Sequence, residues 1–97
     1  MERLIEEKEA SPEVLAVYED IMAPGALDPL TKELVYVAVS ITNNCPYCIA
    51  SHTAAARAKG MSDGQLAELI AVIGLANETN RLAVGYSVPV DERFAGR

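Results

Sequence analysis

Apolar residues recur along most of this chain at intervals of three and four, the spacing that places side chains on one face of an α-helix. Proline, glycine and asparagine interrupt helices and favour turns. They break the apolar pattern at four places, which are Pro24-Gly25, Thr42-Asn43-Asn44, Gly60 and Val88-Pro89. The pattern therefore predicts an all-α fold of four to six helices in a single domain over residues 1–97.

Each predicted helix begins at a capping signal. Ser11, Asp28 and Cys45 each directly precede a proline, and Ser62 precedes an aspartate. Small polar residues cap helix N-termini, and proline is tolerated at the first helical position. The expected helices cover residues 12–23, 29–41 and 46–59, with a last helical region from residue 62 to Val88-Pro89. Within that region Gly74 is a point at which the helix could divide.

Both ends of the chain are expected to lie outside the main fold. Residues 1–10 are acidic and form a lead-in, and residues 89–97 form a polar tail that is too short to fold alone. Such a tail could lie across a neighbouring subunit. Because the helices are rich in apolar residues for so short a chain, some of their surface is expected to face another copy of the chain.

The segment 29–41 is apolar nearly all round, which is typical of a helix buried in the core or in a subunit interface. Its second half, residues 35–41, is β-branched and would also suit a buried strand. The cap at Asp28 and the sequence Lys32-Glu33-Leu34 favour the helix.

Composition and charge narrow the function. The net charge is −6, with eight Lys and Arg against fourteen acids, and this argues against nucleic-acid binding. The longest apolar runs are far shorter than the roughly 20 residues that span a membrane. The acidic N-terminus lacks the apolar core of a signal peptide. A cytoplasmic location without membrane association is expected.

The stretch 44–52 carries the chemistry. It contains both cysteines, Cys45 and Cys48, and His52, the one histidine of the chain. Residues three and four apart share a helix face, so these three side chains should lie together at the start of a helix. A helix N-terminus favours a negatively charged sulfur. In a reducing compartment, a Cys-x-x-Cys pair is more often catalytic or metal-binding than structural.

Three interpretations compete for this stretch. Cysteines and a histidine can simply fill a helical core. They can bind a metal, with Glu33 as a fourth ligand, although structural zinc sites usually gather ligands from two separate pairs. They can also carry thiol redox chemistry, in which a thiolate is oxidised by peroxide and a second thiol closes a disulfide. We favour redox chemistry, and helix electrostatics alone point to Cys45 as the stronger nucleophile.

Two redox families share features with this stretch. Cys-Pro-Tyr-Cys is also the motif of glutaredoxins, but the flanking segments lack the lengths and strands of that fold. The wider pattern Glu33-x11-Cys45-x2-Cys48-x3-His52, with Ser40, Asn44 and Gly60-x-Ser62, resembles the AhpD-like alkylhydroperoxidases of the carboxymuconolactone decarboxylase superfamily. The resemblance covers about residues 12–86.

The resemblance implies an all-helical oligomer of trimers or hexamers that reduces hydroperoxides. Cys48 would be the peroxidatic thiol and Cys45 the resolving one, with Glu33 and His52 as a proton relay for Cys48. No bound cofactor or metal is implied; an external dithiol of the lipoyl type, or another protein dithiol, would reduce the disulfide. The alternatives are a disulfide reductase or redox sensor of the same fold, and a helical subunit whose cysteines bind metal or hold an assembly together.

Overall fold

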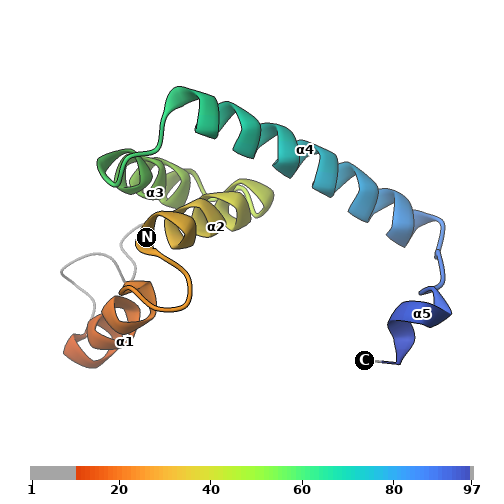
Figure 1. The fold of residues 1–97 in the computed structure, drawn as a ribbon, viewed down its shortest axis with the longest axis horizontal. Coiled ribbons are helices and arrows are strands. Elements are labelled where there is room, and N and C mark those ends of the chain that lie inside the picture. Colours follow the sequence, from red (N-terminus) through yellow and green to blue (C-terminus); the bar gives the residue numbers. More distant parts are fainter. Residues whose placement is uncertain (1–10, 97) are drawn as a thin grey trace.

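The computed structural model describes residues 11–96, which form five α-helices and no β-strand (Figure 1). The helices are α1 (Pro12–Met22), α2 (Pro29–Thr42), α3 (Pro46–Ala58), α4 (Asp63–Gly85) and α5 (Glu92–Ala95). The all-α prediction is confirmed. The alternative of a strand at residues 35–41 is wrong, because that segment lies within α2. The lead-in, residues 1–10, falls outside the described residues.

The capping signals act as the sequence predicts. The side chains of Ser11 and Asp28 each accept a backbone N–H from three residues further on, at 3.2 and 2.7 Å. Ser62 and Gln65 form a reciprocal capping box, in which each side chain accepts the other's backbone N–H, at 3.1 and 2.8 Å. These bonds satisfy N–H groups that a helix leaves without partners in its first turn.

The C-terminal third differs from the sequence prediction in two ways. α4 continues through Gly74 as one helix of 23 residues, so the chain does not divide there. Glycine lowers helix propensity but keeps its backbone N–H, and no proline or new cap follows to end the helix. The tail also contains the short helix α5, although this helix packs against none of the other four.

The small core lies where α2 packs along α3. α4 also contacts α2, and α1 has a smaller contact with α2. Three polar side chains are buried there, namely Glu33, Ser40 and His52. They lie among the buried apolar residues Val37, Cys48, Ala56, Met61 and Ile73. His52 and Val37 are the largest side chains that are fully buried. Three of the four residues predicted to carry chemistry, Glu33, Cys48 and His52, therefore belong to the core.

α4 extends far beyond this core (Figure 1). It reaches α2 as far as Asn77, whose side-chain amide donates to the hydroxyl of Thr42 at 3.0 Å, and all α4 residues beyond Asn77 are exposed. The radius of gyration is 16.3 Å, compared with roughly 12.5 Å for a compact domain of this length. None of the described helices is both long enough and apolar enough to cross a membrane.

Candidate active site at the start of helix α3

A tight turn sets the start of α3 against the end of α2. Asn44 adopts a left-handed backbone conformation with φ of 57°, which asparagine tolerates better than most residues. The N–H groups of Asn44 and Cys45 donate to the carbonyls of Ile41 and Ser40, at 3.1 and 3.0 Å. The chain thereby reverses, and α3 runs back along α2.

Cys45 and Cys48 form a disulfide, with their Cα atoms 5.3 Å apart. Cys45 is the N-cap of α3, as predicted, and its Sγ accepts the backbone N–H of Cys48 at 3.4 Å. Cys48 is 7% exposed, whereas Cys45 is only half-buried. The cysteines therefore differ: Cys45 caps the helix and is partly accessible, and Cys48 is buried in the core.

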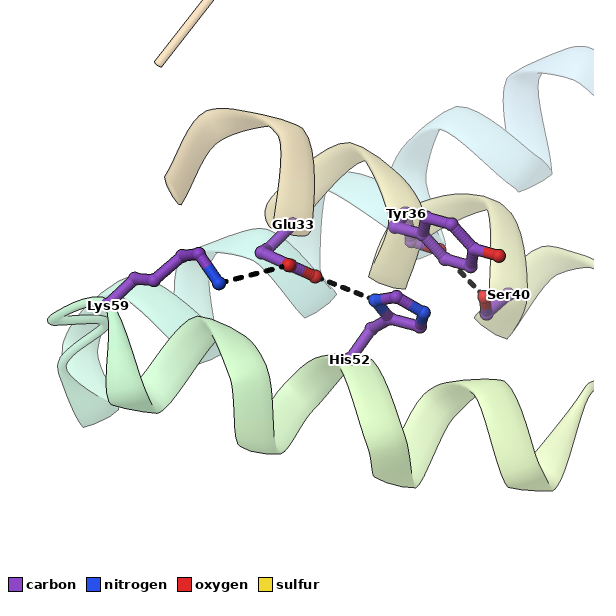
Figure 2. Close-up of polar contacts among 5 residues, drawn as sticks. All are labelled: Glu33, Tyr36, Ser40, His52 and Lys59. Atoms are coloured by element: carbon purple, nitrogen blue, oxygen red, sulfur yellow. Dashed lines mark hydrogen bonds and ion pairs between the residues drawn. The ribbon is translucent and has the colours of Figure 1, made fainter. Parts of the chain in front are cut away.

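Glu33 and His52 are paired in the core. The Nδ1 atom of His52 lies 2.7 Å from Oε1 of Glu33 (Figure 2). The two residues are 1% and 4% exposed. Burying these polar groups is unfavourable unless they are hydrogen-bonded to each other. Glu33 is therefore a core residue and not an exposed acid at the start of α2.

His52 is also placed relative to the cysteines. It lies one turn after Cys48 on the same helix, and both side chains are buried. Figure 2 shows the second ring nitrogen of His52 on the side of the ring away from Glu33. The four residues singled out from the sequence therefore gather in one site, which we call the thiol site: Glu33, Cys45, Cys48 and His52.

Tyr36 was not singled out from the sequence. Its ring stacks on the imidazole of His52, with centroids 3.6 Å apart and an angle of 16° between the planes. Tyr18 approaches the same imidazole edge-on, with centroids 6.4 Å apart. The stacked ring of Tyr36 therefore helps to fix the orientation of the imidazole. Its position three residues after Glu33, on the same face of α2, was the available signal.

Lys59 is a second residue that the sequence analysis missed. Its Nζ atom lies 3.3 Å from Oε2 of Glu33, the carboxylate oxygen that does not face His52 (Figure 2). The Lys59 side chain is 40% exposed, so it joins the buried carboxylate to the surface. Gly60, with φ of 106°, ends α3 directly after Lys59. The spacing of seven residues from His52, two helical turns, could have indicated this position.

An apolar groove of about 1030 Å³ leads to the cysteines. We define the groove by its walls: α1 and the following loop on one side and α2 on the other, with Cys45 and Cys48 at one end. Val35 and Val39 of α2 are 52% and 53% exposed within it. In the single chain, α2 is thus buried on the face that packs against α3 and partly exposed on the face that lines the groove.

The described residues offer little for a metal. Among residues 11–96, no three His, Cys, Asp or Glu side chains are grouped so that they could hold an ion. The two cysteine sulfurs are bonded to each other. Of the two carboxylate oxygens of Glu33, Oε1 faces His52 and Oε2 faces Lys59. The arrangement instead suits a dithiol–disulfide couple beside a buried acid–base pair.

Comparison with known proteins agrees with this geometry. The sequence pattern of the Carboxymuconolactone decarboxylase family matches residues 10–89. The chain belongs to this family. The fold is similar to the crystal structure of the alkylhydroperoxidase AhpD core from Rhodospirillum rubrum, with a TM-score of 0.81 and 50% sequence identity. That match covers 90% of this chain and 68% of the Rhodospirillum chain. The AhpD-like fold inferred from the cysteine pattern is confirmed.

A curated relative adds no function. The chain is 43% identical over 56 residues to "Uncharacterized protein 4 in cox locus" of Paracoccus denitrificans. The match covers 58% of this chain and half of the length of that relative. The AhpD-like fold and the Cys45–Cys48 disulfide fit the family.

Proposed function

We propose that this protein is a thiol-dependent peroxidase that reduces hydroperoxides through Cys45 and Cys48. The observation that carries the proposal is the buried Glu33–His52 hydrogen bond, one helical turn from Cys48. A cysteine pair alone could be structural. A buried carboxylate that orients an imidazole beside that pair gives the thiol a base, which peroxide reduction requires.

The first half of the reaction consumes the peroxide. An ionised carboxylate only accepts hydrogen bonds, so Glu33 accepts the Nδ1 proton of His52 and leaves Nε2 to act as the base. Nε2 takes the thiol proton of Cys48, and the thiolate attacks the terminal oxygen of the hydroperoxide. The O–O bond breaks, Cys48 becomes a sulfenic acid, and the alkoxide takes the proton from His52 to leave as an alcohol.

The second half restores the enzyme. The sulfur of Cys45 attacks the sulfenic acid of Cys48, expels water and forms the disulfide that the structure contains. Reduction then needs two electrons and two protons from outside. We propose a small dithiol of the lipoyl type, or a protein dithiol, as the donor, and the cytoplasm as the compartment. No bound cofactor is needed for any of these steps.

A second function has one observation in its favour. Cys45 is the more accessible sulfur, and it accepts a backbone N–H at the helix N-terminus. These properties suit attack on a disulfide of another protein. The same site would then work as a disulfide reductase or redox sensor without a peroxide substrate.

Intact mass separates these functions. The fully reduced protein is mixed with one equivalent of an organic hydroperoxide, and peroxide loss is followed in parallel. A peroxidase loses about two mass units at the rate at which peroxide disappears, because both cysteine protons are lost on disulfide formation. No change within minutes, together with rapid oxidation by a disulfide substrate, would reject the peroxidase and favour the reductase.

A further inference from the structure

Many apolar side chains are exposed on the C-terminal segment of the described chain. We define the C-terminal arm as residues 75–95, the second half of α4 together with the tail and α5. Its exposed apolar side chains include Leu75, Leu82, Val84, Tyr86, Val90 and Phe94, which are 49% to 79% exposed. Scattered apolar residues are normal on protein surfaces, but so many on one 21-residue segment mark an interaction surface.

The same chain has an apolar groove, and α1, the loop that follows it and α2 leave one side of this groove open to solvent. The groove between α1 and α2 is lined mainly by apolar side chains, among them Val14, Val17 and Ile21, which are 43% to 61% exposed. It ends at Cys45 and Cys48, so whatever covers the groove also shields the thiol site.

The arm cannot cover the groove of its own chain. α4 is one unbroken helix, roughly 35 Å long. It packs against α2, meets α3 at its first residue through the Arg57–Asp63 ion pair, and does not pack against α1. It carries α5 to the far side of the molecule from α1 (Figure 1). Bringing residues 75–95 to α1 would require α4 to break, and α4 continues without interruption even at Gly74.

The exposed area is large enough for a stable interface. The chain exposes 7122 Å², whereas a compact monomer of its mass exposes roughly 5,400 Å². The excess of roughly 1,700 Å² is twice the ~800 Å² that each partner buries in a standard protein–protein interface. A second copy of the chain supplies both an arm and a groove, so the apolar arm of each copy can be buried in the apolar groove of another.

We propose that the C-terminal arm of one copy seats in the groove of a second copy and forms the missing wall of its thiol site. Oligomerisation then contributes directly to the site, because each thiol site is incomplete without the neighbour's arm. Exchange between two copies closes a dimer, and passing each arm to the next copy closes a ring. Seated in this way, the arm keeps bulk water from the groove side of Cys45 and Cys48.

Two arm variants test the assembly. Leu82→Glu with Val84→Glu places two charges on the arm, where neither residue is buried in the single chain. The control is Ala67→Glu, on the exposed surface of the first half of α4. Light scattering after size exclusion should give a multimer for the wild type and for Ala67→Glu, and a single-chain mass for the double variant. Circular dichroism checks that the double variant remains helical.

Cross-linking tests the contact itself. In a Cys45→Ser, Cys48→Ser background, one preparation carries Val17→Cys in the groove and a second carries Val84→Cys in the arm. Mixing them under mild oxidation should give a cross-linked pair of the two variants. Ala67→Cys in place of Val84→Cys should not cross-link. If the background does not fold, the light-scattering result decides.

Alkylation tests the shielding of the thiols and does not depend on peroxide activity. Iodoacetamide should label reduced Cys45 several-fold faster in the double variant than in the wild type or Ala67→Glu. A monomeric wild type, an unchanged multimer in the double variant, or a missing Val17–Val84 cross-link in a folded background would each overturn the proposal. Equal binding of an apolar dye, anilinonaphthalene sulfonate, by wild type and double variant would assign the groove to a small ligand instead and overturn it as well.

Discussion

The carboxylate of Glu33 and the imidazole of His52 face each other at 2.7 Å in the interior of the protein, on two helices and 19 residues apart. The pair joins α2 to α3 at the point where the core is most completely buried. It also determines which ring nitrogen of His52 faces the start of α3. One hydrogen bond therefore serves both the packing of the two helices and the proposed proton transfer.

Glu33→Gln is expected to slow peroxide consumption roughly 100-fold, within the range that general base catalysis contributes. Glutamine keeps the shape and an accepting oxygen, so the fold should persist, but it removes the negative charge that stabilises a protonated His52. The measurement is the rate of Cys48 alkylation and of peroxide loss as a function of pH.

Glu68→Gln is the matched control, because Glu68 is an exposed acid on α4. It should leave both rate profiles unchanged. An unaltered rate-versus-pH profile in a folded Glu33→Gln protein would refute the relay.

Replacing each cysteine by serine is expected to stop the reaction at a different step. Cys48→Ser should abolish peroxide consumption, because the peroxidatic sulfur is lost. Cys45→Ser should allow one turnover and then stop, because no thiol remains to resolve the sulfenic acid of Cys48. Intact mass after one equivalent of peroxide should show one added oxygen in Cys45→Ser and none in Cys48→Ser. The reverse pattern would make Cys45 the attacking thiol, as its position at the helix N-terminus suggests.

Lys59→Met is expected to lower the rate of disulfide formation by roughly two- to fivefold, because a partly exposed ion pair contributes up to about 1 kcal/mol. The methionine keeps the length of the side chain but removes the charge that faces Oε2 of Glu33. Lys59→Arg should recover most of the rate.

Arg57→Met serves as its control, since Arg57 pairs with the exposed carboxylate of Asp63 at the same end of α3. A loss of rate in Arg57→Met equal to that in Lys59→Met would mean that the general charge of this end of α3, rather than the contact with Glu33, sets the rate.

The sequence predicted the local structure well because local structure follows from local signals. Ser11, Asp28, Cys45 and Ser62 each cap a helix, as their neighbours in the sequence indicated. Gly74 misled because a single glycine weakens a helix without ending it. The short helix α5 has no strong signal beyond the acidic residues at its start.

The site was only half visible in the sequence. Cys45, Cys48 and His52 lie within one helix, so their spacing was enough to bring them together. The contact between Glu33 and Lys59 joins residues 26 apart, and it depends on how far α3 runs along α2. The groove likewise depends on the angle between α1 and α2, which no spacing in the sequence specifies.

Asp28 links the stability of α2 to pH. Its carboxylate accepts the N–H of Thr31, and this bond, made at the first turn of the helix, lowers the pKa of Asp28 below its ordinary value of 3.8. The ionised cap therefore contributes stability above pH 3.8, and this contribution is lost as the pH falls through the lowered pKa of the folded state. Since Glu33 lies five residues further along α2, the cap also helps to hold the thiol site.

The prediction is tested with Asp28→Asn and Asp28→Ala in denaturant unfolding between pH 7 and pH 2. Asparagine keeps an accepting oxygen without a charge, so at pH 7 Asp28→Asn should be slightly less stable than the wild type, and Asp28→Ala clearly less stable. The difference between wild type and Asp28→Asn should shrink below pH 3.8, because the wild-type carboxyl becomes protonated and loses its advantage. A difference that stays constant down to pH 2 would show that the charge of Asp28 contributes nothing and that its hydrogen bond alone caps α2.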